Sequence, residues 1–75
     1  MNLNNIKLNT SCVIKSINIK DEKIKVRLME LGLIEGCKVS VCKKSVFKKT
    51  LLIIFNSCCF TLKENLAVDI VVNYA

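Results

Sequence analysis

The chain has no proline, histidine or tryptophan and only two glycines among its 75 residues. The absence of histidine removes the commonest general base near neutral pH and a frequent ligand of transition metals. Because proline and glycine are the residues best suited to sharp turns, few positions can reverse the chain easily. Both glycines, Gly32 and Gly36, fall within RLMELGLIEGCKVSV, residues 27–41, which predicts a special backbone shape there.

The chain also lacks a long apolar segment. Its longest uninterrupted apolar run is LLIIF, residues 51–55, whereas a helix that spans a bilayer needs about 20 such residues. The first ten residues have neither the charged start nor the apolar block of a secretory signal. We therefore expect a cytoplasmic protein whose residues 1–75 form a single domain.

Acidic side chains are scarce: six Asp and Glu face twelve Lys and Arg, for a net charge of +6. Such a charge attracts nucleic acid, anionic lipid and acidic proteins alike, and does not choose among them. The five cysteines are an odd number with no export signal, so we expect free thiols in a reducing compartment.

Hydrophobic periodicity predicts one helix and five short strands. The helix starts at the N-cap Asp21 and places Ile24, Leu28 and Leu31 on one side. The strands are expected at residues 11–17, 38–43, 50–55, 58–62 and 69–74, with one helical turn at 65–68. Strict alternation in the first strand would put Val13 and Ile17 on one face, and Cys12 and Ile14 on the other.

The two glycines have separate expected roles. Gly32 suits the left-handed residue that follows the helix, which would bring Leu33 back against Leu28 in a Schellman ending. Gly36 suits the third position of a type II turn formed by residues 34–37. A small barrel closed to protect its edges fits this order of elements, and a sheet with one face covered by the helix is the structural alternative.

Residues 27–41 resemble the ferrous iron transport protein A family, FeoA. The mark of that family is Arg-Leu, two variable residues, Leu-Gly-Leu, a variable residue, Pro-Gly and an alternating valine strand. The matching positions here are Arg27, Leu28, Leu31, Gly32, Leu33, Gly36, Val39 and Val41. The likeness extends over nearly the whole chain, from IKLN at residues 6–9 to FTLKENLAVDIVV at residues 60–72.

The chain departs from the family pattern at three turns. Glu35 replaces the proline before the second glycine, Leu8-Asn9 replaces an early Pro-Gly, and Ser57 stands where the later hairpin has glycine. Asparagine tolerates left-handed backbone better than most residues, and a missing turn proline costs only about 0.4–1 kcal/mol. We expect the turns to survive, with the geometry at Ser57 left open.

The resemblance implies an all-β, SH3-like small β-barrel of about five strands with one helix inserted between the first and second strands. It also implies a non-enzymatic accessory of ferrous iron uptake, acting by protein-protein contact with FeoB, a membrane transporter that carries a GTPase domain. Two alternatives stay open: a basic module that binds nucleic acid, and a module that serves an iron-responsive regulator. Self-association through the strand at residues 50–55 is also left open.

No catalytic residue, cofactor or metal site is predicted. Cys37 and Cys42 are five positions apart on a strand, and Cys58 and Cys59 are adjacent, so neither pair shares a face that could hold iron or another transition metal ion. A cysteine nucleophile would lack a histidine base. The chain has no glycine-rich phosphate loop.

Two surface features remain as candidates for binding. Lysines 43, 44, 48 and 49 flank an expected hairpin, where they either keep strands of other molecules from pairing or attract an anionic membrane surface. Nucleic acid is disfavoured, since the chain has a single arginine and few aromatic residues. The expected partner-binding residues are Arg27, Leu31, Leu33 and Ile34, on a loop shaped by Gly32 and Gly36. Arg27 has an equal alternative as a charge on the flank of the helix, paired with Glu30 or with a strand carbonyl. Leu33 has an alternative as a buried helix stop.

Overall fold

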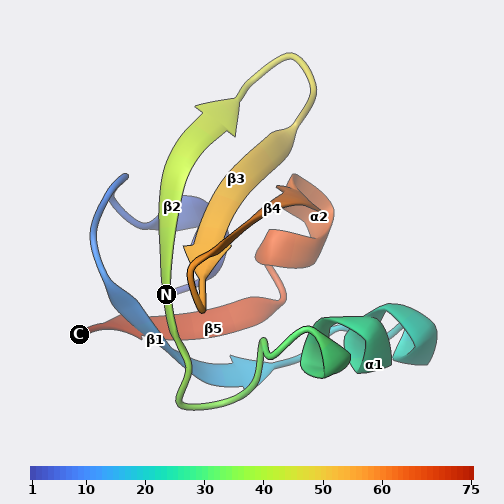
Figure 1. Cartoon of the computed structure of the whole chain (residues 1–75). Helices are drawn as coiled ribbons and strands as arrows, with labels where there is room; N and C mark the ends of the chain where they lie inside the picture. Colours follow the sequence, from blue (N-terminus) through green and yellow to red (C-terminus); the bar gives the residue numbers. More distant parts are fainter.

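The structure, a computed structural model, describes residues 1–75 and contains one five-stranded antiparallel sheet (Figure 1). In chain order the elements are η1 (Leu3–Asn5), β1 (Cys12–Ile17), α1 (Glu22–Glu30), β2 (Lys38–Ser45), β3 (Thr50–Phe55), β4 (Cys58–Lys63), α2 (Glu64–Ala67) and β5 (Ile70–Tyr74). The order across the sheet is β4-β3-β2-β1-β5. The five strands, the helix between the first two and the helical turn before the last are confirmed.

The sheet curls where β1 meets β2. That pairing is short, with only Cys12 opposite Val39 and Val13 opposite Lys38, whereas β2–β3 and β3–β4 pair along most of their lengths. As a result β2, β3 and β4 form one limb, and β1 and β5 run across its base (Figure 1). This curl lets one small sheet enclose its own apolar face, as the expected SH3-like fold requires.

The core is one cluster of 17 buried residues, all of them apolar. It consists of Leu3, Ile6, Cys12, Ile14, Ile17, Ile19, Leu28, Leu33, Val39, Val41, Leu51, Ile53, Phe55, Leu62, Ala67, Ile70 and Val72. In β2 and β3 these residues alternate, so the inward positions predicted for Val39 and Val41 are confirmed. Phe60 of β4 packs on the cluster from its edge, 6.5 Å between ring centroids from Phe55.

The faces predicted for β1 are wrong at its end. Cys12, Ile14 and Ile17 are all buried, whereas Val13 is only half-buried. The pairing of β1 with β5 shifts register between Ile14 and Ser16, so one extra residue lies in the strand. Such a bulge flips the side chains beyond it, which turns Ile17 to the core side. Strict alternation could not have anticipated it.

Helix α1 lies beside the sheet and does not cover its face (Figure 1), so the alternative of a helix-covered sheet is wrong. Asp21 caps its start, as predicted: the carboxylate accepts the N–H groups of Lys23 (3.0 Å) and Ile24 (3.4 Å). Within the helix only Leu28 is fully buried. No helix of the structure combines the length and apolar character needed to cross a membrane.

The turns that lack proline and glycine keep their backbone shape. Asn9 adopts a φ of 59°, and Asn56 and Ser57 adopt 51° and 62°. Positive φ at both central residues of a two-residue loop is the signature of a type I′ hairpin turn, which here joins β3 to β4. The expectation that these turns survive is confirmed.

Strand β3 contains the LLIIF run and is hydrogen-bonded on both edges, by β2 and β4. It therefore has no free backbone edge for pairing with a second chain. Its outward side chains, half-buried Leu52 and partly exposed Ile54, are covered only in part. Self-association through this strand stays a prediction, and it would have to use those side chains.

Ile53 and Ile54 are neighbours in β3 whose exposed fractions are 0% and 36%. We expect Ile53→Ala to lower the free energy of unfolding by about 2–5 kcal/mol, because it leaves a cavity in the core. Ile54→Ala has the same change in strand propensity and should cost less than about 1 kcal/mol. Urea denaturation of both variants measures this difference, and equal losses would contradict the assigned faces.

Candidate functional site: the two-glycine loop

The two-glycine loop, residues 31–36, connects α1 to β2 and begins with a helix stop. Gly32 has a φ of 103°, and its N–H donates to the carbonyl of Met29 (3.0 Å). The N–H of Leu33 donates to the carbonyl of Leu28 (3.0 Å), and both of these leucines are buried. These two hydrogen bonds define a Schellman motif, so the role predicted for Gly32 is confirmed.

The second half of the loop is fastened to β1. Gly36 has a φ of 86°, and the N–H of Cys37 donates to the carbonyl of Ile34 (3.1 Å), as in a type II turn. The N–H of Gly36 donates to the carbonyl of Ile14 (2.8 Å), and the N–H of Ile14 donates to the carbonyl of Cys37 (3.0 Å). The loop is therefore anchored at both ends.

The loop exposes two of its three apolar side chains. Leu31 and Ile34 are 49% and 47% exposed, whereas Leu33 is fully buried. Leu33 therefore supports the loop from below and offers no surface to a partner. Its alternative role as a buried helix stop is the one observed. Leu31, predicted to share the inner side of the helix with Leu28, lies instead at the C-cap and faces outward.

Ile34 stands between two open hollows. One, of about 460 Å³, is lined by Ile17, Lys25, Met29, Ile34 and Glu35. The other, of about 450 Å³, is lined by residues 32 and 34–38 together with Asn56 of the β3–β4 turn. An apolar side chain on a fixed loop beside concave surface is the kind of feature that packs into a partner.

Arg27 lies on the exposed flank of α1, one turn before Leu31. Its backbone carbonyl accepts the N–H of Leu31 (3.2 Å), which ties its position to the start of the loop. The structure thus brings Arg27, Leu31 and Ile34 to one end of the molecule. Met29 and Asn56 lie at the same end, although the sequence did not predict it. No motif marks Met29 as a contact residue, and Asn56 is distant from the loop in the sequence.

The acidic and cysteine side chains are dispersed over the structure. No three His, Cys, Asp or Glu side chains lie close enough together to hold a metal ion. All five cysteines are free. Burial raises the pKa of the Cys12 thiol, which keeps it protonated and unreactive.

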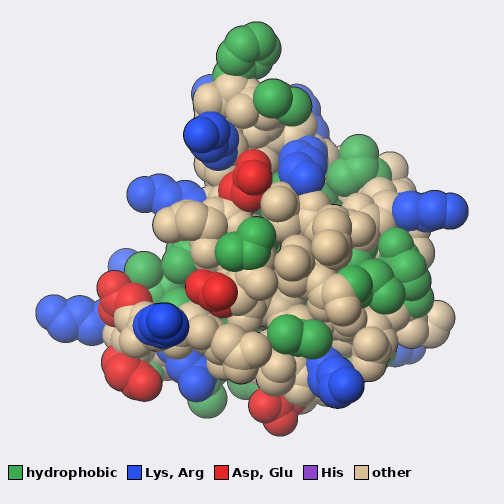
Figure 2. Space-filling model, turned by 180° about the vertical axis from the view of Figure 1, so that it is seen from behind, with side chains coloured by type: hydrophobic (Ala, Val, Ile, Leu, Met, Phe, Trp, Pro, Cys, Tyr) green, Lys and Arg blue, Asp and Glu red, His purple; other side chains and the backbone are tan.

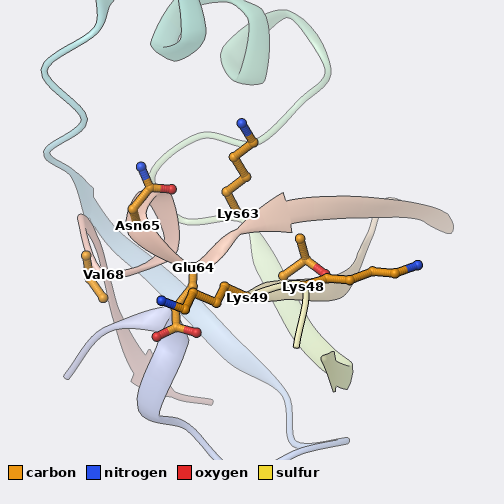
Figure 3. A pocket seen from close by; sticks show the side chains of 7 residues that line it. Lys48, Lys49, Lys63, Glu64, Asn65 and Val68 are labelled. Atoms are coloured by element: carbon orange, nitrogen blue, oxygen red, sulfur yellow. The ribbon is translucent and has the colours of Figure 1, made fainter. Parts of the chain in front are cut away.

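A third hollow, of about 310 Å³, lies between the turn of the β2–β3 hairpin and the junction of β4 with α2, and is lined mostly by polar residues (Figure 3). Lys48 and Lys63 extend away from each other, and Lys49 lies beside Glu64. Because the ammonium groups diverge, they do not enclose one anion. The hollow adds positive charge to this end of the molecule without forming a discrete ligand site.

The model of the FeoA domain matches residues 1–74. This chain belongs to the FeoA family. The resemblance predicted from residues 27–41 is therefore confirmed. The family consists of SH3-like domains associated with iron transport. No curated protein matches the chain.

Solved FeoA structures share the fold over almost the whole chain. FeoA from Chlorobium tepidum is 26% identical, with a TM-score of 0.90 over 99% of this chain and 70% of that one. FeoA from Stenotrophomonas maltophilia, crystallised with zinc and described as an SH3 domain protein, is 32% identical, with a TM-score of 0.83 over 97% of this chain and 89% of that one. IdeR from T. acidophilum is 20% identical, with a TM-score of 0.82 over the whole of this chain and 34% of that one, a likeness of fold alone.

The glycines differ in what a side chain would meet. A Cβ at Gly32 would collide with Nδ2 of Asn56, whereas nothing lies within 4 Å of one at Gly36. Gly36→Ala should lower the free energy of unfolding by about 1–2 kcal/mol, because alanine is strained at a positive φ. Gly32→Ala should lower it further, because of the added collision. Adding Asn56→Gly to Gly32→Ala should recover the excess, as measured by thermal unfolding. If the second change recovers nothing, Asn56 does not limit the loop.

The thiols should differ in reactivity. Cys58 and Cys59 are exposed, whereas Cys12 is buried with a raised pKa. Alkylation by iodoacetamide followed by mass spectrometry should modify the first two rapidly and Cys12 only after unfolding, because the thiolate is the reacting species. Modification of Cys12 at the rate of Cys58 in the native protein would contradict the packing of β1.

Proposed function

We propose that this FeoA protein is an accessory of ferrous iron uptake that binds the cytosolic region of a FeoB-type GTPase transporter through its two-glycine loop. Membership of the FeoA family supports the link to iron uptake. The Stenotrophomonas maltophilia relative is described as a candidate activating factor for ferrous iron transport. The exposed pair Leu31 and Ile34 on an anchored loop is the observation that carries the choice of surface.

The loop suits docking because its shape exists before the partner arrives. Hydrogen bonds at Gly32 and Gly36 hold both turns, so little backbone freedom remains to be lost on binding. Burying one exposed apolar side chain contributes up to about 1.5–3 kcal/mol, and Leu31 and Ile34 are each about half exposed. Two such side chains can anchor a transient contact of modest affinity.

Charges around the loop nearly cancel. Four acidic residues, Asp21, Glu22, Glu30 and Glu35, are interleaved with Lys20, Lys23, Lys25, Arg27 and Lys38. The contact proposed here should therefore depend on apolar burial more than on long-range attraction, and salt should weaken it little. Arg27 is the one charged residue of the loop region expected to contribute to affinity, because its guanidinium can make two parallel hydrogen bonds to one carboxylate of the partner.

The proposed site of action is the cytoplasmic side of the membrane, where the GTPase region of the transporter would be reached. The protein would act there by contact with that region. A change in the partner's shape or nucleotide cycle would be the consequence of that contact.

Replacing either exposed apolar residue of the loop should weaken binding. We expect Leu31→Ser and Ile34→Ser each to lower the affinity for the purified GTPase region about tenfold, because each removes buried apolar area. Isothermal titration calorimetry measures the change. Val68→Ser is the matched control: Val68 is 43% exposed but belongs to the end of α2, so this variant should bind like the wild type.

Two results would reject the proposal. One is an absence of binding by the wild-type protein to both the GTPase region and the full transporter. The other is an equal loss of affinity in the Val68→Ser control, which would place the contact elsewhere. Thermal unfolding of each variant separates loss of binding from loss of fold, and exposed positions should leave the melting temperature nearly unchanged.

A further inference from the structure

The β2–β3 hairpin ends in the most exposed apolar side chains of the molecule. Phe47 is fully exposed and Val46 is 79% exposed. The hairpin stands out from the body in Figure 1, and Figure 2 shows hydrophobic side chains at its far end with lysine or arginine side chains below them. Val46 and Phe47 are adjacent, so they form a small apolar patch, and an apolar patch rimmed by polar residues is typical of an interaction site.

Lysines surround this apolar tip. The lysine hairpin, residues 43–49, contains Lys43, Lys44, Lys48 and Lys49 and no acidic residue. It therefore supplies four positive charges to a chain whose net charge is +6. The ammonium group of Lys44 donates to the carbonyl of Asn4 (2.7 Å), which fastens the hairpin to the body. The other three lysines are also exposed.

We propose that the lysine hairpin docks on an anionic lipid surface, with Phe47 and Val46 inserted at the level of the headgroups and the lysines contacting lipid phosphates and carboxylates. Apolar and aromatic side chains bordered by basic ones match the chemistry of that interface. Basic residues near the surface add electrostatic attraction that falls off within a Debye length.

The arrangement of charges favours a lipid surface over a folded protein or a nucleic acid. Lys48 and Lys49 extend in different directions in Figure 3, so they fit a broad anionic plane better than one carboxylate or phosphate. Lys63 adds to this charge and Glu64, beside Lys49, offsets part of it. Proteins that bind single-stranded nucleic acid stack successive bases on several aromatic side chains, whereas this hairpin offers one phenylalanine and no arginine.

The depth of insertion is limited by the backbone. Residues 46–49 form a turn outside the β ladder, where the N–H of Lys48 donates only to the hydroxyl of Ser45 (3.4 Å). Backbone groups without partners are costly in hydrocarbon, so the turn should stay in the interfacial region while its side chains reach inward. Docking should therefore be reversible and sensitive to salt.

The lysine hairpin and the two-glycine loop lie at opposite ends of the molecule. In Figure 1 the hairpin points up and α1 lies near the bottom. Docking by the hairpin would leave Leu31 and Ile34 facing away from the lipid. The proposal does not depend on the function proposed above, because it uses other residues.

The absence of tryptophan from the chain allows a direct test. Phe47→Trp and Ile34→Trp each introduce a single tryptophan at an exposed position, one on each end. Vesicles of phosphatidylcholine with one-third phosphatidylserine should shift the emission of Phe47→Trp to shorter wavelength, and brominated lipid should quench it. The emission of Ile34→Trp should not change. A shift at Ile34→Trp alone, or at neither position, would overturn the proposal.

Vesicle sedimentation measures how much each group of residues contributes to the partition coefficient between water and anionic vesicles. Val46→Ser with Phe47→Ser should lower the partition coefficient about tenfold or more, since the apolar contact is lost. Lys48→Glu with Lys49→Glu should lower it at least about tenfold. Lys20→Glu with Lys23→Glu makes the same charge change at exposed positions just before and within the first turn of α1, and should have a much smaller effect. Vesicles of phosphatidylcholine alone should bind weakly.

Three outcomes would reject this mode of docking. Equal losses for the two charge-reversal pairs would show attraction by net charge alone. Full binding by the serine variant would show that the apolar tip does not insert. Binding of generic duplex DNA more tightly than the anionic vesicles at the same salt concentration would assign the lysines to nucleic acid.

Discussion

The fold depends on how residues 31–37 return the chain from α1 onto β1. Two positive φ angles, at Gly32 and Gly36, make the return possible. The hydrogen bonds between Ile14 and residues 36 and 37 then fix β1 to the start of β2. Because β1 and β2 pair over so short a length, these bonds hold the two limbs of the sheet together. The same constraint that closes the core presents Leu31 and Ile34 to solvent.

The molecule separates two kinds of surface. One end, at α1 and the two-glycine loop, carries nearly balanced charges and a small apolar contact. The other, at the lysine hairpin, carries four of the net positive charges and the most exposed ring. A rigid small domain with unlike ends is suited to lie between two partners, because binding at one end does not bury the other.

The interior contains no buried polar or charged side chain. The buried residues are all apolar, and the one buried thiol has a raised pKa because burial disfavours its charge. The link to iron transport comes from membership of the FeoA family.

The order of strands and helix, the cap at Asp21 and both glycine turns could be predicted from the sequence, because each is a local pattern of a few residues. The family could be predicted because its motif at residues 27–41 is also contiguous. The inward positions of Val39 and Val41 followed from alternation for the same reason. Tertiary structure decided what depends on distant pairing: the bulge that turned Ile17 inward, the burial of Leu33 and the approach of Asn56 to Gly32. It also decided that Phe47 has no neighbour to cover it, since exposure depends on where the rest of the chain packs and no local pattern records that.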